Sequence, residues 1–379
     1  MTRPPGGVRA VALVDGEHYP PVVRDALAEL PYDFVGAILV GGTEKLRGED
    51  ISYGVPLVDG FAGAEVVVDL SDEPVLGPAA RLVWASRALA EGLPYVGADF
   101  RFDPPAFAPV DVPSVAVIGT GKRVGKTAVT GHLARLLARD RTVVVVAMGR
   151  GGPSEPEVVA TPPGLDELVR LSRAGRHAAS DHLETAALCG VPTVGCRRAG
   201  GGLAGAVFTS NVHEGARLAV ALDPDVIVFD GSGAAIPPVA TERRVLVVGR
   251  DDDETAYLNP YRRLIADVVV RIGVDAELVL TPTAPLEGRV AVFTAGATDV
   301  SHLEADVVHV SPTLADRAAL RSELEAVDAD TYLVELKAAA IDLVAEDALA
   351  RGRRVVLGRN DLAGDGIDEL LLSAAPVAA

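Results

Sequence analysis

The chain is poor in cysteine, tryptophan and lysine, and these shortages narrow its class. It has 379 residues but only two Cys, one Trp and four Lys. Two cysteines in so long a chain make no disulfide framework, and Cys189 and Cys196 form neither a Cys-x-x-Cys pair nor a set with histidine at metal-ligand spacing. We therefore expect both thiols to be reduced and to lie in or near the core.

Long hydrophobic runs and an excess of basic residues are absent as well. No apolar run reaches the roughly 18 to 20 residues that cross a bilayer, and the N-terminal segment carries no small-residue cleavage site. The formal net charge of -18 argues against nucleic acid or a membrane surface as a partner, because both attract basic fields. We expect a cytoplasmic globular protein that meets anionic ligands with local basic pockets.

Several common catalytic signatures are also missing. The sequence has no Gly-x-Ser-x-Gly elbow, no His-Glu-x-x-His and no clustered histidines. No Gly-rich segment meets the dinucleotide fingerprint in its strand-to-helix setting. Serine acyl transfer, zinc hydrolysis and hydride transfer are thereby disfavoured, and phosphoryl chemistry remains.

The most informative segment is GTGKRVGKT, at residues 119–127. The residues before it, 113–119, are typical of a short buried strand, and residues 128–139 have apolar positions three and four apart, which indicates a helix. The segment is therefore predicted to be a strand-to-helix loop.

Such a loop has the chemistry of a polyphosphate cradle. Gly121 and Gly125 let the backbone turn its N–H groups inward, while the helix N-terminus and Lys126 supply positive charge. Thr127 places a hydroxyl where a phosphate-bound Mg²⁺ needs a ligand. We therefore predict a site for a nucleoside triphosphate.

The first position of the loop departs from the pattern Gly-x-x-x-x-Gly-Lys-Ser/Thr, because Thr120 stands there and Gly119 lies one residue early. The alternative is a chance Gly-rich turn, but the strand-to-helix context favours a phosphate loop. The nucleotide-binding residues predicted from it are Thr120, Gly121, Lys122, Arg123, Val124, Gly125, Lys126, Thr127 and Ala128.

Lysine is rare among the 35 basic residues, so each lysine is a candidate for a role that arginine cannot fill. Lys122 and Lys126 fall in the predicted phosphate loop. Lys45 and Lys337 lie elsewhere, and for these two a solvated surface side chain is the alternative.

The order of the predicted elements indicates two α/β domains. Residues 1–100 alternate strand-like and helix-like runs and predict an N-terminal domain that binds substrate or acts as a lid. The proline-dense residues 101–113 are typical of an extended linker. Residues 114–379 predict a P-loop NTPase-like catalytic domain with a mostly parallel sheet, helices on both faces, and strands that include 268–272 and 290–294.

Polar residues at predicted strand ends should meet at one edge of this sheet. Asp230 ends the apolar run VIVFD and is predicted to bind Mg²⁺ together with Thr127, the alternative being an ordinary strand-to-turn Asp. The run at 251–254 is acidic, and we expect either a solvated loop or a position near the nucleotide.

Two Gly-rich loops add arginines. Arg150 follows the strand at 142–147 and suits an anionic substrate or a transferring phosphoryl group. Arg197 and Arg198 precede three glycines that include Gly201, and together these groups would hold a phosphate. The alternatives are a plain turn and a basic surface loop.

Two loops of the predicted N-terminal domain are placed like ligand loops. Glu17 and His18 follow the first strand, and Lys45 follows the next. Glycines are common after strands in any α/β domain, so these loops alone carry little weight.

Taken together, DGEHYPPV, GTGKRVGKTAVTGHL, AMGRGGPSEPEVV, GCRRAGGGLAG, DGSGAAIPPV and VELKAAAIDLV resemble the cyclic 2,3-diphosphoglycerate synthetases over nearly the whole chain. The core also resembles dethiobiotin synthetase, whose loop likewise has Thr at the position of Thr120. The resemblance implies an ATP-dependent, Mg²⁺-requiring ligase that closes an intramolecular phosphoanhydride in 2,3-diphosphoglycerate and releases ADP and phosphate.

The resemblance also implies roles for the residues above. Lys126 and Lys122 would neutralise the β and γ oxygens of ATP, and with Arg150 they are the predicted catalytic residues. A homodimer is expected. The predicted substrate-binding residues are Arg150, Arg197, Arg198, Gly201, Glu17, His18, Lys45 and Lys337.

Two alternatives stay open. A kinase that phosphorylates 2-phosphoglycerate would use the same site but stop before ring closure. A nucleotide-dependent switch or partitioning ATPase would hydrolyse ATP without a small acceptor and use the nucleotide to bias an interface.

Overall fold

The computed structural model describes residues 7–46, 51–176 and 181–377. The chain folds into two compact units, and three crossings of the backbone join them. The first unit holds residues up to 106 and the segment 253–265, and the second holds 107–252 and everything after 265. The segment 253–265 therefore belongs to the first unit, although the residues on both sides of it in sequence belong to the second. Its helix α7 (Asn259–Leu264) packs against α2 (Pro78–Ala90).

The first unit is built on a sheet in the order β2-β1-β3-β4-β5, in which β5 pairs antiparallel with β4 and the other pairs of neighbouring strands are parallel. The apolar runs of β1 and β3 are buried on both faces, as a parallel sheet covered by helices requires. Because β2 and β3 flank β1, the loops after β1 and β3 meet at a topological switch point. The remaining elements and their bounds are β1 (Arg9–Val14), α1 (Pro20–Glu29), β2 (Asp33–Leu39), β3 (Val66–Asp69), β4 (Tyr95–Val96) and β5 (Arg101–Phe102).

A parallel sheet in the order β11-β10-β8-β12-β7-β14-β15 forms the body of the second unit, with short antiparallel strands β9 and β11 beside β10. The predicted class, a mostly parallel P-loop-like sheet with helices, is confirmed. Cys189 and Cys196 are free and buried, as expected. The elements are β6 (Ala108–Pro109), β7 (Ser114–Gly119), α3 (Lys126–Leu137), β8 (Val143–Gly149), β9 (Glu157–Val159), α4 (Leu165–Arg173), α5 (Asp181–Cys189), β10 (Thr193–Ala199), β11 (Thr209–Ser210), α6 (Val212–Val220), β12 (Val226–Asp230), β13 (Val239–Ala240), β14 (Arg243–Val248) and β15 (Val268–Arg271).

The central strand β7 leads straight into the predicted phosphate loop. All six residues of β7 are buried between β12 and β14, and α3 starts at Lys126, two residues before the predicted helix. Apolar side chains of α3, among them Val129 and Leu133, are fully buried in the core beneath it. The sheet thus fixes both ends of the loop.

A second sheet, in the order β16-β20-β19-β17-β18, follows in the same unit. The prediction that 290–294 continues the first sheet is wrong, because β17 lies between β18 and β19 here. Strand-helix alternation looks the same in both sheets, so the sequence does not mark where one ends. The elements are β16 (Glu277–Pro282), β17 (Arg289–Phe293), β18 (Asp306–Ser311), α8 (Arg317–Ala326), β19 (Thr331–Glu335), a π-helix (Ala340–Ala345), α9 (Glu346–Ala350), β20 (Arg354–Ala363) and α10 (Ile367–Leu372).

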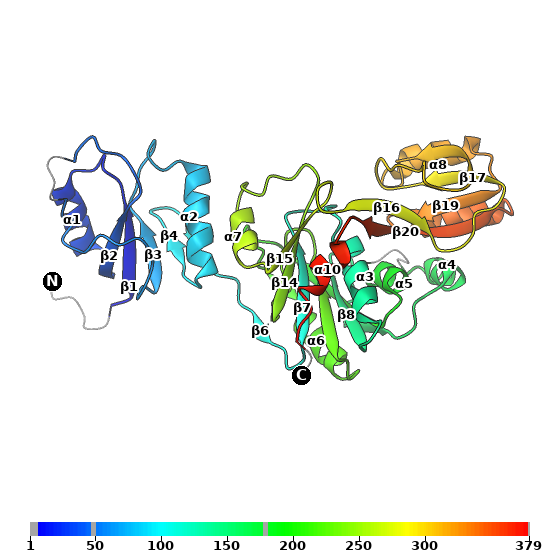
Figure 1. The fold of residues 1–379 in the computed structure, drawn as a ribbon, viewed down its shortest axis with the longest axis horizontal. Helices are drawn as coiled ribbons and strands as arrows, with labels where there is room; N and C mark the ends of the chain where they lie inside the picture. Colours follow the sequence, from blue (N-terminus) through cyan, green and yellow to red (C-terminus); the bar gives the residue numbers. More distant parts are fainter. Residues whose placement is uncertain (1–6, 47–50, 177–180, 378–379) are drawn as a thin grey trace. The chain divides into compact units, whose positions relative to one another are not determined.

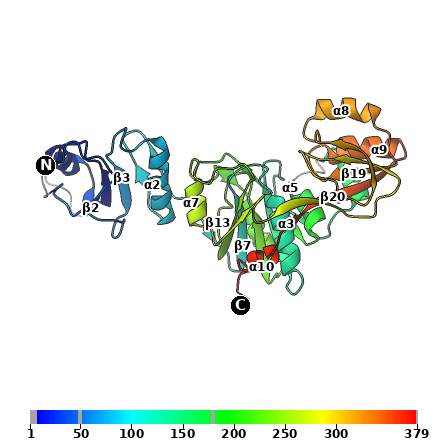
Figure 2. The same cartoon turned by 45° about the horizontal axis from the view of Figure 1, so that its top comes forward.

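The long strand β20 of the C-terminal sheet packs against a helix of the P-loop sheet. It pairs with β19 and β16 in the C-terminal sheet and also contacts α3, the helix that follows the phosphate loop (Figures 1 and 2). Residues of the C-terminal sheet are thereby brought beside the first turns of α3.

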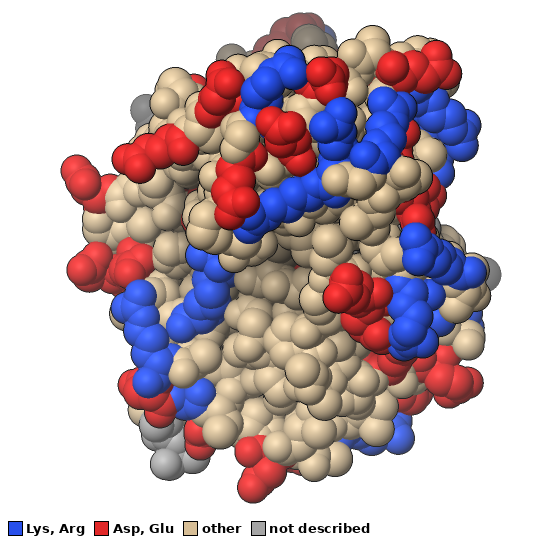
Figure 3. Space-filling view, turned by 90° about the vertical axis from the view of Figure 1, so that its right-hand side faces the viewer, with Lys and Arg blue, Asp and Glu red and all other residues tan. Residues whose placement is uncertain are grey.

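The surface carries both signs of charge. On the face drawn in Figure 3, basic and acidic side chains lie side by side, so the basic residues form no broad field there. None of the helices that the structure describes combines the length and apolar character needed to span a lipid bilayer.

Candidate functional site

The phosphate loop has two residues in the left-handed region, Arg123 with φ of 64° and Gly125 with φ of 93°. Gly125 is the N-cap of α3, where a residue without Cβ adopts this conformation at least cost. The Lys126 ammonium curls back over the loop and donates to the Gly121 carbonyl at 2.7 Å. A phosphate oxygen is the natural competitor for this donor, because N⁺–H···O⁻ bonds are the stronger ones.

Lys126 is only 8% exposed and lies among charges of both signs. Burial is the largest influence on its pKa, and the positive charges of Lys337 and Arg150 add to the effect, while Asp230 and Asp252 oppose it. Together they lower the pKa of Lys126 to about 8. Lys126, Lys337 and Arg150 therefore lie close enough to repel one another, and a bound polyanion would reduce this repulsion.

Thr120 ties the phosphate loop to the loop that follows β14. Its hydroxyl donates to the Asp252 carboxylate, and its amide donates to the Val247 carbonyl at 3.1 Å. A glycine could not make the side-chain bond. The departure from the standard pattern thus has a structural use, and one residue of the acidic run lies beside the loop.

Asp230 ends β12, in register with Val117 of β7 and Ala147 of β8. It is 6% exposed, and its Oδ1 accepts from the Thr130 hydroxyl at 3.1 Å. Carboxylate and hydroxyl oxygens are hard ligands that suit Mg²⁺, which needs only one or two protein ligands besides phosphates. The donor set of Asp230 and Thr127 fits that ion, although no group of three or more His, Cys, Asp or Glu side chains is arranged to hold a metal in the described ranges.

Arg150 and Arg198 approach each other at the loop after β12. A Cβ placed on Gly233 would stand 2.8 Å from Nη2 of Arg150 and 3.4 Å from Nη2 of Arg198. Arg198 donates to the Ser232 and Gly200 carbonyls, both at 2.7 Å, so it braces these loops. No described residue forms a hydrogen bond or ion pair with the Arg150 guanidinium, which is exposed.

The other predicted substrate residues of this unit divide into two groups. Gly201 lies beside Arg198, since a Cβ on it would stand 3.3 Å from Nη1. Arg197 is exposed and precedes Arg198 on β10, and successive side chains of a strand point to opposite faces. The structure therefore brings Arg150, Arg198 and Gly201 together and leaves Arg197 on the other face.

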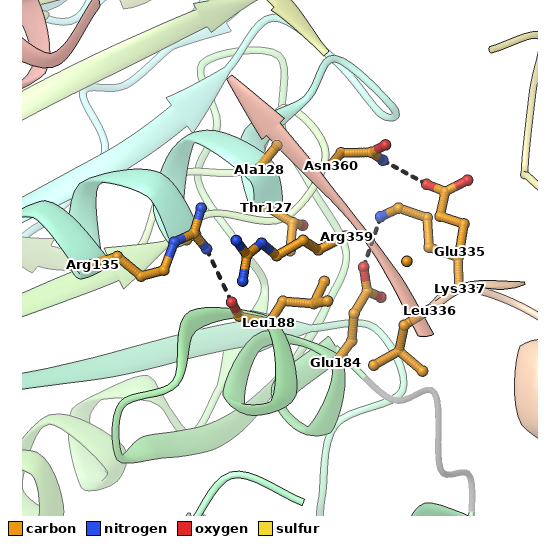
Figure 4. Close-up of a pocket in the computed structure, with 12 residues that line it drawn as sticks. Thr127, Ala128, Arg135, Glu184, Leu188, Glu335, Leu336, Lys337, Arg359 and Asn360 are labelled. Atoms are coloured by element: carbon orange, nitrogen blue, oxygen red, sulfur yellow. Dashed lines mark hydrogen bonds and ion pairs between the residues drawn. The ribbon is translucent and has the colours of Figure 1, made fainter. Parts of the chain in front are cut away.

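A small cavity of about 20 Å³ lies between α3, α5 and the C-terminal sheet (Figure 4). Thr127 and Ala128 line it from α3, and Lys337 reaches it from the residues after β19. Lys337 donates to Oε1 of Glu184 at 2.7 Å, and the charge of Glu184 raises the pKa of Lys337 despite its burial. The structure thus places Lys337 beside α3, the helix that follows the phosphate loop.

In the first unit, the predicted residues Glu17, His18 and Lys45 lie on two adjacent loops. Lys45 donates its amide to the Gly16 carbonyl at 2.9 Å, and Glu17 Oε1 accepts from the Thr43 amide at 3.3 Å. His18 Nδ1 bonds Oδ1 of Asp15 at 2.8 Å. Burial favours a higher pKa for Asp15, but hydrogen bonds from the Asp72 amide and His18 outweigh it and lower the pKa. Their role in substrate binding stays a prediction.

Five polar residues of the cavity were not predicted from the sequence: Arg135, Glu184, Glu335, Arg359 and Asn360. Glu335 is 7% exposed and accepts from the Asn360 amide at 2.7 Å and from the Ala295 amide at 2.8 Å. Glu184 lies within a helix where any sequence has glutamates, and Asn360 follows the apolar run RVVLG at which the strand seemed to end. Only the pairing of strands and helices in space reveals them.

A strand, a phosphate loop and a helix at the centre of a parallel sheet define a P-loop nucleotide-binding fold. Family models for the cyclic 2,3-diphosphoglycerate synthetase match along the chain, with the N-terminal domain at residues 9–62 and 60–103, the P-loop domain at 114–284 and the C-terminal domain at 275–361. The chain belongs to the cyclic 2,3-diphosphoglycerate synthetase family.

Curated relatives of that name agree over almost their whole length. The synthetase of Rubrobacter xylanophilus is 47% identical, with 98% of both chains covered. That of Pyrococcus horikoshii is 41% identical over 93% of this chain and 92% of its own. Among solved structures, LpxK from Aquifex aeolicus in complex with ATP matches with a TM-score of 0.43 and 17% identity, over 71% of this chain and 90% of that one.

Proposed function

We propose that the protein makes cyclic 2,3-diphosphoglycerate from 2,3-diphosphoglycerate and ATP, forming an intramolecular phosphoanhydride and releasing ADP and phosphate. One observation carries the proposal beyond the family name. Burial lowers the pKa of Lys126 most, and the charges of Lys337 and Arg150 lower it further against those of Asp230 and Asp252, so the three cations lie close together. A polyanion bound among these three side chains would stabilise their charged forms.

The proposed substrate carries several negative groups that repel one another. Two phosphates and a carboxylate on three carbons repel one another, and ring closure needs the phosphates to touch. Cations fixed in a partly buried site screen that repulsion far better than water does. The cluster of three cations therefore suits a polyanionic acceptor better than ATP hydrolysis alone.

The proposed chemistry has two steps. An oxygen of one substrate phosphate attacks the γ-phosphorus of ATP, and the bond to ADP breaks. An oxygen of the other substrate phosphate then attacks the activated substrate phosphorus, expels inorganic phosphate and closes the ring. Both steps are in-line displacements, for which positioning and charge neutralisation supply most of the catalysis.

The residues divide the work by position. Lys126 neutralises the β and γ oxygens of ATP, and the exposed Lys122 of the same loop adds a second positive charge there. Arg150 and Lys337 hold the acceptor and the transferring phosphoryl group, while Arg198 and Gly201 shape the loops around them. Thr127 and Asp230 would hold Mg²⁺, which neutralises phosphate charge when bound.

Phosphorus NMR tests the proposal directly. Wild-type protein with ATP, Mg²⁺ and 2,3-diphosphoglycerate should give the resonances of a cyclic phosphoanhydride, ADP and inorganic phosphate. A second incubation contains 2-phosphoglycerate instead. If it yields 2,3-diphosphoglycerate and neither incubation yields a cyclic product, the kinase alternative replaces the proposal. ADP release that ignores both glycerate phosphates would point to a switch ATPase.

We also propose that the enzyme acts as a homodimer on this small-molecule substrate, with neither nucleic acid nor membrane as partner. Light scattering on the purified chain should give about twice the 39.2 kDa mass of one copy. A monomer at micromolar concentration contradicts the dimer and leaves the chemistry unaffected.

A further inference from the structure

Glu184 is a buried carboxylate that no step above uses. It sits in the first half of α5, its side chain is 9% exposed, and it holds the Lys337 ammonium at 2.7 Å. The two partners come from different sheets of the second unit, since α5 packs on β8 and β10 while Lys337 follows β19. The pair therefore brings a lysine from the C-terminal sheet to the P-loop body.

The position of this pair relates it to phosphate binding. Glu184 and Lys337 line the cavity that Thr127 and Ala128 line from the first turn of α3 (Figure 4). The charge of Lys337 is felt at Lys126, and that of Asp230 is felt at Lys337. An ammonium that interacts with both the phosphate-loop lysine and the predicted Mg²⁺ ligand lies within electrostatic reach of bound phosphates.

Glu184 and a phosphate would compete for the same donor. A carboxylate carries one negative charge and a terminal phosphate carries up to two, so the phosphate is the stronger partner once it is near. Lys126 offers a parallel, since its ammonium bonds the Gly121 carbonyl, a weaker acceptor than phosphate. Both lysines are thus held in place by partners that a nucleotide can replace.

We propose that Lys337 exchanges Glu184 for the terminal phosphate of the bound nucleotide. Glu184 is then the positioning residue that holds this lysine at the cavity and sets how strongly the site prefers a triphosphate over a diphosphate. The inference rests on the proposed function only in that the site binds ATP.

The exchange predicts an unusual sign for Glu184→Gln. The amide keeps the shape and a hydrogen-bond acceptor for Lys337 but removes a negative charge that competes with phosphate. Triphosphate binding should therefore become tighter. Lys337→Met should weaken it and should do so more than the double variant, because the single change leaves a buried carboxylate without its lysine.

Isothermal titration of the full chain with Mg²⁺ and either adenylyl imidodiphosphate or ADP tests the exchange. Glu184→Gln should bind the triphosphate analogue about fivefold more tightly, and Lys337→Met about tenfold more weakly, with ADP shifted less than about twofold in each. The double variant should fall between wild type and Lys337→Met.

A matched control is Glu346→Gln. Glu346 of α9 pairs with Arg173 of α4 at 2.8 Å, beside the core of the C-terminal sheet, and it does not line the cavity. It should leave both affinities unchanged.

The result that overturns the inference is a Glu184→Gln protein that binds the analogue no more tightly than wild type, or one whose ADP affinity changes equally. If that variant fails to fold, the double variant decides, because it must lose part of the wild-type preference for triphosphate over ADP. Wild-type protein that binds neither nucleotide would overturn the proposed function as well. If instead the wild-type protein forms the product and Glu184→Gln keeps the wild-type preference for triphosphate over ADP, only the exchange is overturned.

Discussion

The sheet of the first unit and the P-loop sheet differ in how charged side chains at the carboxyl ends of their strands are paired. In the first unit, the predicted basic residues His18 and Lys45 have carboxylates beside them. His18 bonds Asp15 at 2.8 Å and lies 3.5 Å from the Asp72 carboxylate, and Lys45 pairs with Glu44. His18 and Lys45 are thus each paired with carboxylates, so these loops offer little net attraction to a polyanion.

At the P-loop sheet, two of the predicted ligand cations form no ion pair within the described ranges. Lys126 bonds a neutral carbonyl, and no ion pair involves Arg150 among the residues that the structure describes. Lys337 is paired, but with a carboxylate that a phosphate can replace. Two sheets of similar topology thus differ in the property that matters for a polyanion, and we expect catalysis at the edge where cations lack ion-pair partners.

The largest expected effect that tests this comparison is loss of nucleotide binding in Lys126→Met. The change removes a buried charge at the β and γ oxygens, and ATP affinity should fall at least about 100-fold. Titration calorimetry measures it. Arg139→Met, just beyond the far end of α3, is the control and should bind ATP normally. Comparable affinity of both variants would mean that the loop does not hold the nucleotide.

The next effect separates two arginines that the sequence could not rank. Arg150→Met should lower kcat about 100-fold, because the guanidinium is free to contact the reacting phosphates. Arg197→Met should lower kcat less than about tenfold, since this side chain points to the other face of β10. Steady-state ADP release measures both, and equal losses would place Arg197 in the site as well.

A smaller effect follows from the Lys126 pKa of about 8. Phosphate binds the ammonium form, so binding takes up a proton at pH values above this pKa. ATP affinity should be flat below pH 8 and should fall up to about tenfold per pH unit above it. Dissociation constants between pH 7 and 9.5 test the slope. Lys126→Arg stays charged over this range and should lose the slope, whereas an equally steep slope in both proteins would assign the proton elsewhere.

Local patterns predicted the strand, loop and helix of the phosphate site well, because Gly-Lys-Thr after a buried strand combines turn chemistry with hydrophobic periodicity. The limits of the first parallel sheet were not predictable. Residues 290–294 have the same buried-strand pattern as 268–272, and only long-range pairing assigns them to different sheets.

The site was predictable only where chemistry and strand ends coincide. Asp230 and Arg150 follow apolar strands directly, so the sheet edge brings them near the loop. Glu184 gave no such signal, because its importance lies in a contact with a residue 153 positions away. The positive φ of Arg123 was equally hidden, since turns usually place glycine there.

The smallest expected effect concerns the first unit. If its loops are electrostatically self-contained, His18→Asn and Lys45→Met should raise the KM for 2,3-diphosphoglycerate only about threefold and leave kcat unchanged, as for weak contacts with a solvated anion. Steady-state kinetics at low and high salt measures this, with Arg101→Met, an exposed residue paired with Asp103, as the control. A loss of kcat similar to that of Arg150→Met would contradict the contrast between the two edges, because a compensated cation would then contribute as much to the reaction as an uncompensated one.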